Sequence, residues 1–511
     1  MLFKINAHTV DGEKEVFYYD NITNAVKNSD KRRLYFWTDK KFEGIKQPYM
    51  EKKEVFSPKN PLKKQRKLNA LKIQLGLKCN YSCAYCSQAS NRINDTSKYP
   101  TEADVDKFFD IIDEQNILLW DKGRIELWGG EPLVYYKVLK YLIPKLRNRW
   151  KKASISIVTN GSLLDKEKID FFLKYNVHIT ISHDGPGFHL RNKDDPMNDP
   201  KMVEIWKYLL DKSIEAKNPM GFNVVISPAN YDLYKIAEFF KKFDERVSFG
   251  FEGIVNYHSD SQSLMIFDKQ KRDTLTQQIF EIITSQWDNP VWHSIQQRAI
   301  RLLEWLVYAK PANSISAKCE STSDQVLAVT LKGDVLSCQN CDPVDFKIGN
   351  IADYDNIAND AFLHWSLRPN CKDCFVLSGC RGGCPYLDHR EHHITCKNER
   401  LLWGAIFAGV WFHLTETIID NIEPYNDMES CDKYYPKEFF HTAEPIHDDI
   451  EQVVPSIKDD IEQIVSSIDD GIIHSLPLIN DDIIQSLPPI DDGIIHSLPP
   501  INDDIEAYKR K

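Results

Sequence analysis

Short apolar runs alternate with amphipathic stretches between residues 70 and 290. Six of these runs have the pattern of strands, and each is closed by Gly, Asn or Pro. They are LKIQLGL (71–77), RIELWGG (124–130), SISIVTNG (154–161), VHITISHDG (177–185), GFNVVIS (221–227) and VSFGFEGI (247–254). The stretches between them have helical spacing, as in 101–115, where Thr101 is the expected N-cap and Asp104 holds the capping-box position. Six strand–helix units in series predict an α/β fold, a parallel sheet curled into a partial (β/α)6 barrel of the TIM type, with ligands at the carboxyl ends of the strands.

The flanking segments divide the chain further. Residues 1–68 contain short β-like runs and predict a β-rich N-terminal extension. The barrel is expected over 69–290. Residues 291–420 are expected to hold a helical bridge, a cysteine-rich, loop-rich region and an apolar helix, and residues 421–511 to form a tail.

The apolar helix is predicted at about 397–417. Its most apolar part, LLWGAIFAGVWFHL (401–414), is shorter than the roughly 20 residues that span a bilayer, which indicates a buried core helix. The N-terminal residues show no secretion signal. We therefore expect a cytoplasmic protein without a membrane partner.

The tail contains a repeat of 11 residues, which recurs six times over 446–511, for example as INDDIIQSLPP (479–489). Prolines recur in most units, so no continuous helix can run through them. The repeats hold 15 acidic and 4 basic residues, which accounts for the whole net charge of −11. The sequence predicts a disordered acidic tail, and the neutral remainder gives no indication of a nucleic-acid partner.

The chain has twelve cysteines, which fall into two groups with Cys431 outside both. In a cytoplasmic protein such spacing indicates metal binding rather than disulfides. Cys79, Cys83 and Cys86 follow the first predicted strand in the spacing C-x3-C-x2-C. Three thiolates on one loop can hold three irons of a 4Fe–4S cube and leave the fourth iron open for catalysis. A structural zinc site would need a fourth ligand, and the loop contains none.

This loop resembles the signature of the radical S-adenosylmethionine (SAM) superfamily. The resemblance implies that the open iron binds the amino and carboxylate groups of SAM, and that reductive cleavage gives methionine and a 5′-deoxyadenosyl radical. It also implies cofactor contacts, although the Asn-Gly and Asp-Gly segments are turn formers as well. The implied contacts are Tyr85 near the adenine, Gly129, Gly130, Glu131 and Pro132 of a GGEP motif near the methionine moiety, and Thr159, Asn160, Ser182 and Asp184 at the next two strand ends.

The second cysteine group resembles the SPASM domain of radical enzymes that mature peptides and proteins. The resemblance implies two auxiliary 4Fe–4S clusters with interleaved ligands: Cys319, Cys338 and Cys384 for the first, and Cys371, Cys374, Cys380 and Cys396 for the second. Cys341 is the candidate for the fourth ligand of the first cluster, and the alternative is an open iron that binds substrate. His389, His392 and His393 are expected on a solvated loop.

Two kinds of enzyme share this architecture, anaerobic sulfatase maturases and maturases of ribosomally made peptides. The sulfatase maturases carry an Asp directly after the cysteine of a G-x4-C motif as the proposed base. Here Gln339 follows Cys338, and it cannot accept a proton, while Asp342 is displaced.

We therefore expect a peptide maturase that forms a thioether or carbon–carbon crosslink in a precursor peptide, with the N-terminal extension as a possible leader contact. We also expect an electron donor such as flavodoxin or ferredoxin as a partner. The alternatives are oxidation of Cys or Ser to formylglycine, or a non-catalytic iron–sulfur electron carrier. The intact cysteine loop and the GGEP motif speak against the electron carrier.

Overall fold

The described part of the computed structural model covers most of the chain up to residue 425. The described residues are 1–37, 40–43, 55–89, 99–256, 265–315, 318, 320–359, 363–387 and 389–425. The predicted repeat tail, Cys319 and Cys431 lie outside the described residues.

The central sheet contains the six parallel strands that the sequence predicts. Each strand pairs in parallel with the next one along the chain, from β7 to β12. The strands are β7 (Lys67–Gln74), β8 (Leu118–Trp128), β9 (Ser154–Thr159), β10 (Val177–Ser182), β11 (Gly221–Ile226) and β12 (Ser248–Ile254). The carboxyl ends of all six strands therefore meet at the same edge of the sheet.

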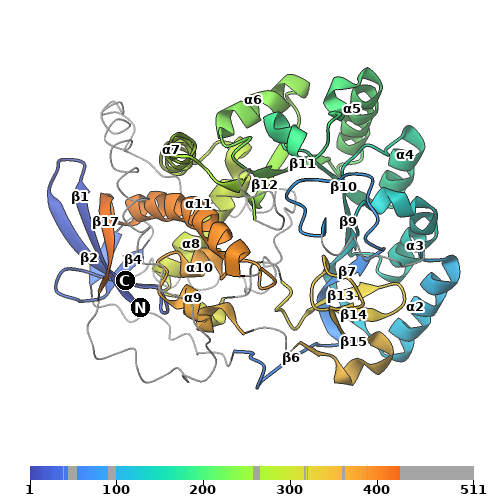
Figure 1. The fold of residues 1–511 in the computed structure, drawn as a ribbon, viewed down its shortest axis with the longest axis horizontal. Coiled ribbons are helices and arrows are strands. Elements are labelled where there is room, and N and C mark those ends of the chain that lie inside the picture. The colour runs from blue at the N-terminus through green and yellow to red at the C-terminus, as the bar shows by residue number, and fades with distance from the viewer. Residues whose placement is uncertain are drawn as a thin grey trace, which may run out of the picture. The chain divides into compact units, whose positions relative to one another are not determined.

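Helices connect these strands and follow the outside of the sheet (Figure 1). They are α2 (Glu102–Glu114), α3 (Tyr136–Arg149), α4 (Lys166–Lys174), α5 (Pro200–Glu215) and α6 (Leu233–Phe243). The predicted capping box of α2 is confirmed, because the Thr101 side chain accepts from the Asp104 backbone and the Asp104 side chain accepts from the Thr101 backbone. Val105, Phe108 and Ile112 of α2 are buried, as expected for the face of an amphipathic helix that packs on a sheet.

Three further strands extend the central sheet beyond β7. β13 (Val326–Thr330) pairs in parallel with β7, and β14 (Asp334–Leu336) and β15 (Lys347–Asn350) follow in antiparallel order. The sequence analysis treated this segment as part of a loop-rich region. These strands were not predicted because they are three to five residues long, and because β13 pairs with a strand more than 250 residues away.

The N-terminal β-like runs form a second, antiparallel sheet of order β17-β1-β2-β3. Its strands are β1 (Leu2–Thr9), β2 (Lys14–Asp20), β3 (Ala25–Lys27) and β17 (Thr417–Tyr425). Figure 1 shows β17 beside β1, and their register runs from Leu2 opposite Tyr425 to Thr9 opposite Thr417. The expected domain boundary at 420/421 therefore falls inside a strand. β17 could not be predicted locally, because its partner β1 lies more than 400 residues earlier in the chain.

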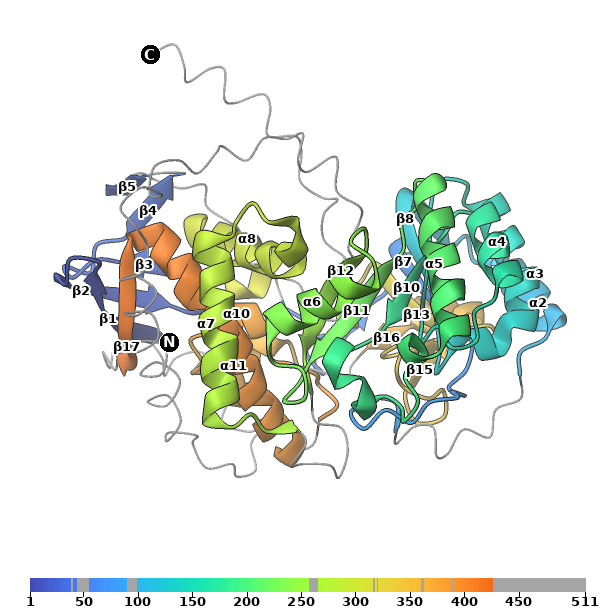
Figure 2. The same ribbon diagram turned by 90° about the horizontal axis from the view of Figure 1, so that it is seen from above.

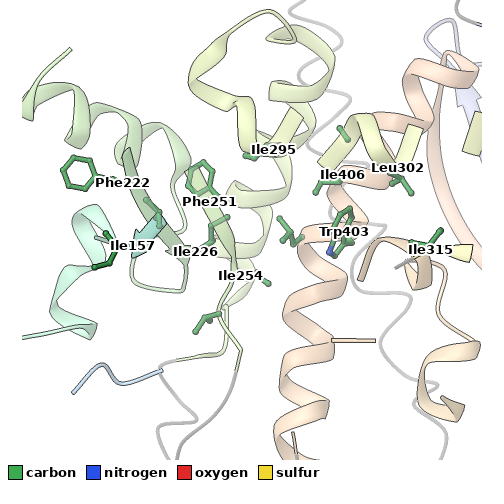
Figure 3. Close-up of a cluster of buried hydrophobic side chains, with 14 of the residues drawn as sticks. Ile157, Phe222, Ile226, Phe251, Ile254, Ile295, Leu302, Ile315, Trp403 and Ile406 are labelled. Atoms are coloured by element: carbon green, nitrogen blue, oxygen red, sulfur yellow. The ribbon is translucent and has the colours of Figure 1, made fainter. Parts of the chain in front are cut away.

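A long helix, α11 (His389–Thr415), packs against α7 (Lys269–Ser285) and α8 (His293–Val307). Figure 2 shows these three helices beside the N-terminal sheet, and Trp411 of α11 makes an edge contact with Phe17 of β2 at 5.2 Å between ring centroids. In Figure 3, Phe251 and Ile254 of β12, Leu302 of α8 and Trp403 of α11 lie in one apolar cluster. The helices are thereby joined both to the barrel and to the N-terminal sheet.

α11 begins eight residues before the predicted start, so His389, His392 and His393 lie in its first turns and the expectation of a loop was wrong. The polar run HREHHITCKNER gave no apolar periodicity from which a helix could be predicted. Within the described residues, no helix is long and apolar enough to cross a membrane.

The remaining elements are short. β4 (Leu34–Trp37) and β5 (Lys40–Glu43) form a hairpin, and β6 (Leu62–Lys63) pairs with β16 (Ala358–Asn359). α9 (Pro369–Lys372) and α10 (Leu377–Cys380) precede α11 in the cysteine-rich region.

Candidate active site

The first cysteine loop lies directly after β7, at the carboxyl edge of the sheet. Its three thiols are close enough to influence one another. The pKa of Cys83 is raised to about 11, mainly by burial, while Arg191 opposes this shift and the thiols of Cys86 and Cys79 add to it. The backbone amide of Cys86 donates to the carbonyl of Cys83 at 3.2 Å. Three neighbouring thiols on one loop fit the donor set of an iron–sulfur cluster, since bound iron favours the thiolate form.

The two glycines of the GGEP motif bring the end of β8 against the chain just before Cys79. The Gly130 amide donates to the Gly76 carbonyl at 3.0 Å, and the Glu131 amide donates to the Lys78 carbonyl at 2.9 Å. A Cβ atom at Gly130 would lie 2.3 Å from the Leu77 carbonyl oxygen. The two glycines that the resemblance places near the methionine moiety thus also permit close approach of the protein backbone.

We expect Gly130→Ala to destabilise the protein and displace the cysteine loop. The added Cβ would overlap backbone oxygens, which cannot move aside as a flexible side chain can, and such overpacking costs about 1–3 kcal/mol. The matched control is Gly253→Ala in β12, where a Cβ would meet nothing within 4 Å. Urea unfolding of both variants under anaerobic conditions measures the free energy of unfolding. Equal losses in the two variants would contradict the packing role of Gly130.

Glu131 of the same motif ties the end of β8 to the end of β9. Its carboxylate is 1% exposed and accepts hydrogen bonds from the Leu133 amide (2.9 Å), the Thr159 hydroxyl (2.6 Å) and the Asn160 amide (2.8 Å). Burial raises the pKa of Glu131, and these hydrogen bonds oppose the shift. Pro132 begins the short 3-10 turn that follows, Pro132–Tyr135. Glu131 and Thr159 are therefore engaged with each other and position Asn160.

Asn160 in turn contacts the cysteine loop. Its side-chain amide donates to the Asn80 side chain at 2.8 Å, and its side-chain oxygen accepts from Ser162. Because Asn80 follows Cys79 directly, the predicted residues at the ends of β8 and β9 are linked to the first cysteine loop through Asn160.

Tyr85 and Asp184, which the resemblance places at the adenine and the ribose, meet in the structure. The Tyr85 hydroxyl donates to Asp184, and Arg191 donates to the same carboxylate at 2.9 Å. The Val225 amide of β11 donates to it at 3.0 Å. Ser182 is half-buried at the end of β10. Arg191 was missed by the sequence analysis, although its place seven residues after Asp184 could have suggested a partner for that carboxylate.

Four cysteines of the second group line one pocket, between α9, α10 and the start of α11. They are Cys371, Cys374, Cys380 and Cys396, the set that the resemblance assigns to one auxiliary cluster. Burial raises the pKa of Cys371 to about 11 and that of Cys396 to about 12. Four thiols around one pocket fit the donor set of a 4Fe–4S cluster.

Polar side chains complete the lining of this pocket. Arg400 lies among the four thiols, and its contacts with Cys374, Cys396 and Cys380 raise its pKa against the effect of burial. His392 also lines the pocket, with Nδ1 3.5 Å from the Cys396 sulfur. The expectation that His392 is merely solvated was therefore wrong.

Two further cysteines of the second group, Cys338 and Cys341, lie on a loop beside β7. The thiols of Cys338 and Cys341 are hydrogen-bonded to each other, and this bond is the main cause that raises the pKa of Cys341, with burial and the nearby Cys384 adding to it. The side-chain amide of Gln74 in β7 holds this loop through the carbonyls of Gln339 (2.7 Å) and Cys341 (2.8 Å). Cys341 thus lies near Cys338 and Cys384, while Cys319 lies outside the described residues.

A hydrogen-bonded link joins this loop to the first cysteine loop. The Asn340 side-chain oxygen accepts from the Trp128 indole at 2.7 Å and from the Gln88 amide at 3.1 Å. Gln88 lies two residues after Cys86 and also donates to the Gly129 carbonyl at 3.3 Å. No local pattern in the sequence points to Gln88 or Asn340, because they meet across 252 residues of chain.

In the described part of the chain, no three Cys, His, Asp or Glu side chains converge on a position for one metal ion. The thiolates of a cubane cluster each bind a separate iron, so a cluster does not require such convergence.

Residues 73–193 match the sequence model of the radical SAM superfamily. The chain is 22% identical over 357 residues to the radical SAM cyclopropyl synthase TigE of Paramaledivibacter caminithermalis, covering 64% of this chain and 69% of that protein. It is 26% identical over 351 residues to the serine-type anaerobic sulfatase-maturating enzyme of Bacteroides thetaiotaomicron, covering 61% of this chain and 81% of that protein. Among solved structures, anSMEcpe with bound AdoMet has a TM-score of 0.51 at 18% identity, over 68% of this chain and 98% of that one, which shows a shared fold.

Proposed function

We propose, from the premise that residues 73–193 form a radical SAM domain, that this chain is a peptide maturase. It would remove hydrogen from a ribosomally made precursor peptide and form a thioether or carbon–carbon crosslink. The observation that carries this proposal is the pocket lined by Cys371, Cys374, Cys380 and Cys396, outside the barrel. Forming such a bond releases electrons, and a second cluster can accept them.

The chain's own residues would bind and orient the reactants. Cys79, Cys83 and Cys86 would hold the radical cluster, which supplies with SAM the 5′-deoxyadenosyl radical that abstracts hydrogen. Tyr85 and Asp184 fix each other's position at the ends of the first and fourth barrel strands. Glu131 fixes the Asn160 backbone.

The auxiliary sites would contain one 4Fe–4S cluster each. Cys338, Cys341 and Cys384, with Cys319, would hold the first, next to β7. The four cysteines of the pocket would hold the second. We infer that Asn340 fixes the position of the first auxiliary site relative to the radical site, since its side chain accepts hydrogen bonds from Gln88 and Trp128.

The substrate would be a precursor peptide, with the N-terminal sheet as its leader contact and a flavodoxin- or ferredoxin-like protein as the electron donor. We infer a cytoplasmic location, because thiols that hold clusters must stay reduced. The similarity to TigE, which is named a cyclopropyl synthase, favours carbon–carbon bond formation.

A second candidate function is oxidation of Cys or Ser to formylglycine. The similarity to a serine-type anaerobic sulfatase-maturating enzyme favours it. Against it stands Gln339, which occupies the position after Cys338 where those enzymes carry an Asp.

Mass spectrometry of candidate peptides distinguishes the two. The reconstituted enzyme, SAM and a reductant are incubated with short peptides encoded beside its gene and with a sulfatase-derived peptide. A peptide maturase gives a peptide that lacks two hydrogens and does not react with hydroxylamine. A hydroxylamine-reactive aldehyde in the sulfatase peptide, with the other peptides unchanged, would overturn the first proposal in favour of the second.

A further inference from the structure

The last barrel strand contains a β-bulge with a carboxylate at its extra position. Along β11 and β12, Val224 is opposite Phe251, but the next residue, Val225, is opposite Gly253. Glu252 is therefore the additional residue of β12. Bulges leave one residue unpaired and re-aim its side chain, and they are frequent next to active sites.

Two residues of α8 hold the backbone of this bulge. The Ser294 hydroxyl accepts from the Phe251 amide at 2.9 Å. Arg298 donates to the carbonyls of Phe251 and Glu252, both at 2.7 Å. Arg298 is only 9% exposed, and burial of a charged side chain is costly unless it is hydrogen-bonded. Because a buried arginine donates to two of its backbone carbonyls, the bulge is stabilised by specific contacts of the fold.

The side chain of Glu252 lies near the proposed ribose site. Its carboxylate accepts from the side-chain amide of Asn223 at 3.0 Å, and Asn223 is opposite Ser182 in the neighbouring strand. The charged groups that act on it come from several elements: Arg191 and Asp184 after β10, Lys318 before β13, and Arg298 of α8.

Glu252 is open to water, yet protein atoms surround it. The residue is exposed. Burial nevertheless raises its pKa, with Arg191 opposing and Asp184 adding to the shift. The exposure of Glu252 and the raised pKa of its carboxyl are compatible when the carboxylate lies in a recess between elements, where water reaches it but protein atoms surround it. A carboxyl with a raised pKa exchanges its proton nearer to neutral pH, which suits acid–base work.

Among the described residues, four other carboxylates of this region are engaged. Asp184 accepts from Tyr85, Arg191 and Val225, and Glu131 accepts three hydrogen bonds from its own neighbourhood. Glu126 and Glu320 form ion pairs with Lys72 at 3.0 and 3.3 Å. Glu252, which accepts a hydrogen bond from the neutral side-chain amide of Asn223, is by contrast a water-accessible carboxylate.

We propose that Glu252 is the proton-accepting side chain of the substrate site, a role that rests on the proposed peptide-maturase function. SAM is the oxidant of the step. One electron from the radical cluster would cleave SAM to methionine and the 5′-deoxyadenosyl radical, and this radical would take one hydrogen atom from the substrate carbon to give 5′-deoxyadenosine. The new bond would then form as the hydrogen on its other atom leaves as a proton to Glu252, and the electron released would be taken up by an auxiliary cluster. Glu252 supplies the base that Gln339 cannot.

The activity test uses E252Q, which keeps the shape and the contact with Asn223 but cannot accept the proton. The cluster-loaded variant should bind the precursor peptide and form 5′-deoxyadenosine, while crosslinked peptide per 5′-deoxyadenosine falls about 100-fold, within the usual range for loss of a general base. E252D should recover part of this ratio. The matched control E238Q removes an exposed carboxylate of α6 that pairs with Lys242 and should leave the ratio unchanged.

The pH profile gives the sign of the effect. Glu252 must be deprotonated to accept a proton, so product formation by the wild type should fall as the pH drops through its raised pKa. In E252Q this acidic limb should disappear from the residual rate. An unchanged ratio and an unchanged acidic limb in a folded E252Q would overturn the proposal.

A labelling experiment reports on Glu252 independently of turnover. Carbodiimide with an amine nucleophile modifies protonated carboxyls, and peptide mass spectrometry reads each site in the anaerobic holoenzyme. The labelling midpoint of Glu252 should lie at higher pH than that of Glu238, whose pKa is lowered by its hydrogen bond with Lys242. Coinciding midpoints would overturn the role of Glu252. If the wild type forms no crosslink but the midpoints differ, the proposed function fails while the assignment of the carboxyl's environment stands.

Discussion

Replacing Cys79, Cys83 and Cys86 together with alanine should abolish SAM cleavage and lower the bound iron by about four per chain, one cube. The three thiols share one loop at the carboxyl edge of the sheet, and we expect no other side chain to replace them. The auxiliary cysteines lie in other elements, around β7 and around the start of α11. The variant should therefore keep about eight irons.

The measurements are iron content and 5′-deoxyadenosine formed under strong reductant. The control is Cys431→Ala, since Cys431 belongs to neither cysteine group; this variant should retain full iron and cleavage. If the triple variant still produces 5′-deoxyadenosine, the assignment of the first loop is wrong.

Loss of the pocket cysteines should leave SAM cleavage intact, unlike loss of the first cysteine loop, but should abolish formation of the crosslinked product. Alanine at Cys371, Cys374, Cys380 and Cys396 should also remove about four of roughly twelve irons, but leave reductive cleavage of SAM in place while crosslinked product disappears. The radical loop does not depend on these residues, whereas the electron released by the substrate would lose its acceptor.

The same change should lower stability, because a cluster bound in this pocket would join α9, α10 and α11. The single variant Cys396→Ser tests the same site with a smaller change, in case the quadruple variant fails to fold. Iron content that remains near twelve in both variants would show that the pocket does not bind a cluster. A wild-type plateau near four irons would contradict both auxiliary sites.

The barrel could be predicted because its signals are local. Each of its six strands is a short apolar run with a clear end, and α2 carries its own capping box in Thr101 and Asp104. The cysteine spacing and the GGEP motif are local as well, whereas the contact between Tyr85 and Asp184 joins residues 99 positions apart.

The rest depends on distant partners. β13 exists as a strand because β7 lies beside it, and β17 because β1 does. The side-chain oxygen of Asn340 accepts from Gln88 and Trp128, which lie more than 200 residues earlier. Glu252 is visible in the sequence as a charged residue inside the apolar run SFGFEGI. Its position at a β-bulge, however, follows only from the pairing of β12 with β11.

The pairing of β1 with β17 also orders events during synthesis. Asn6 donates to Asn421 at 2.6 Å, across 415 residues of chain. At about 5–20 residues per second, a ribosome needs roughly 20–80 seconds to supply the second strand after the first. Throughout that time one edge of β1 has no partner, and an unpaired strand edge is a template for pairing with other chains. A ribosome that stalls before residue 417 thus releases a chain whose first strand is free to join another copy.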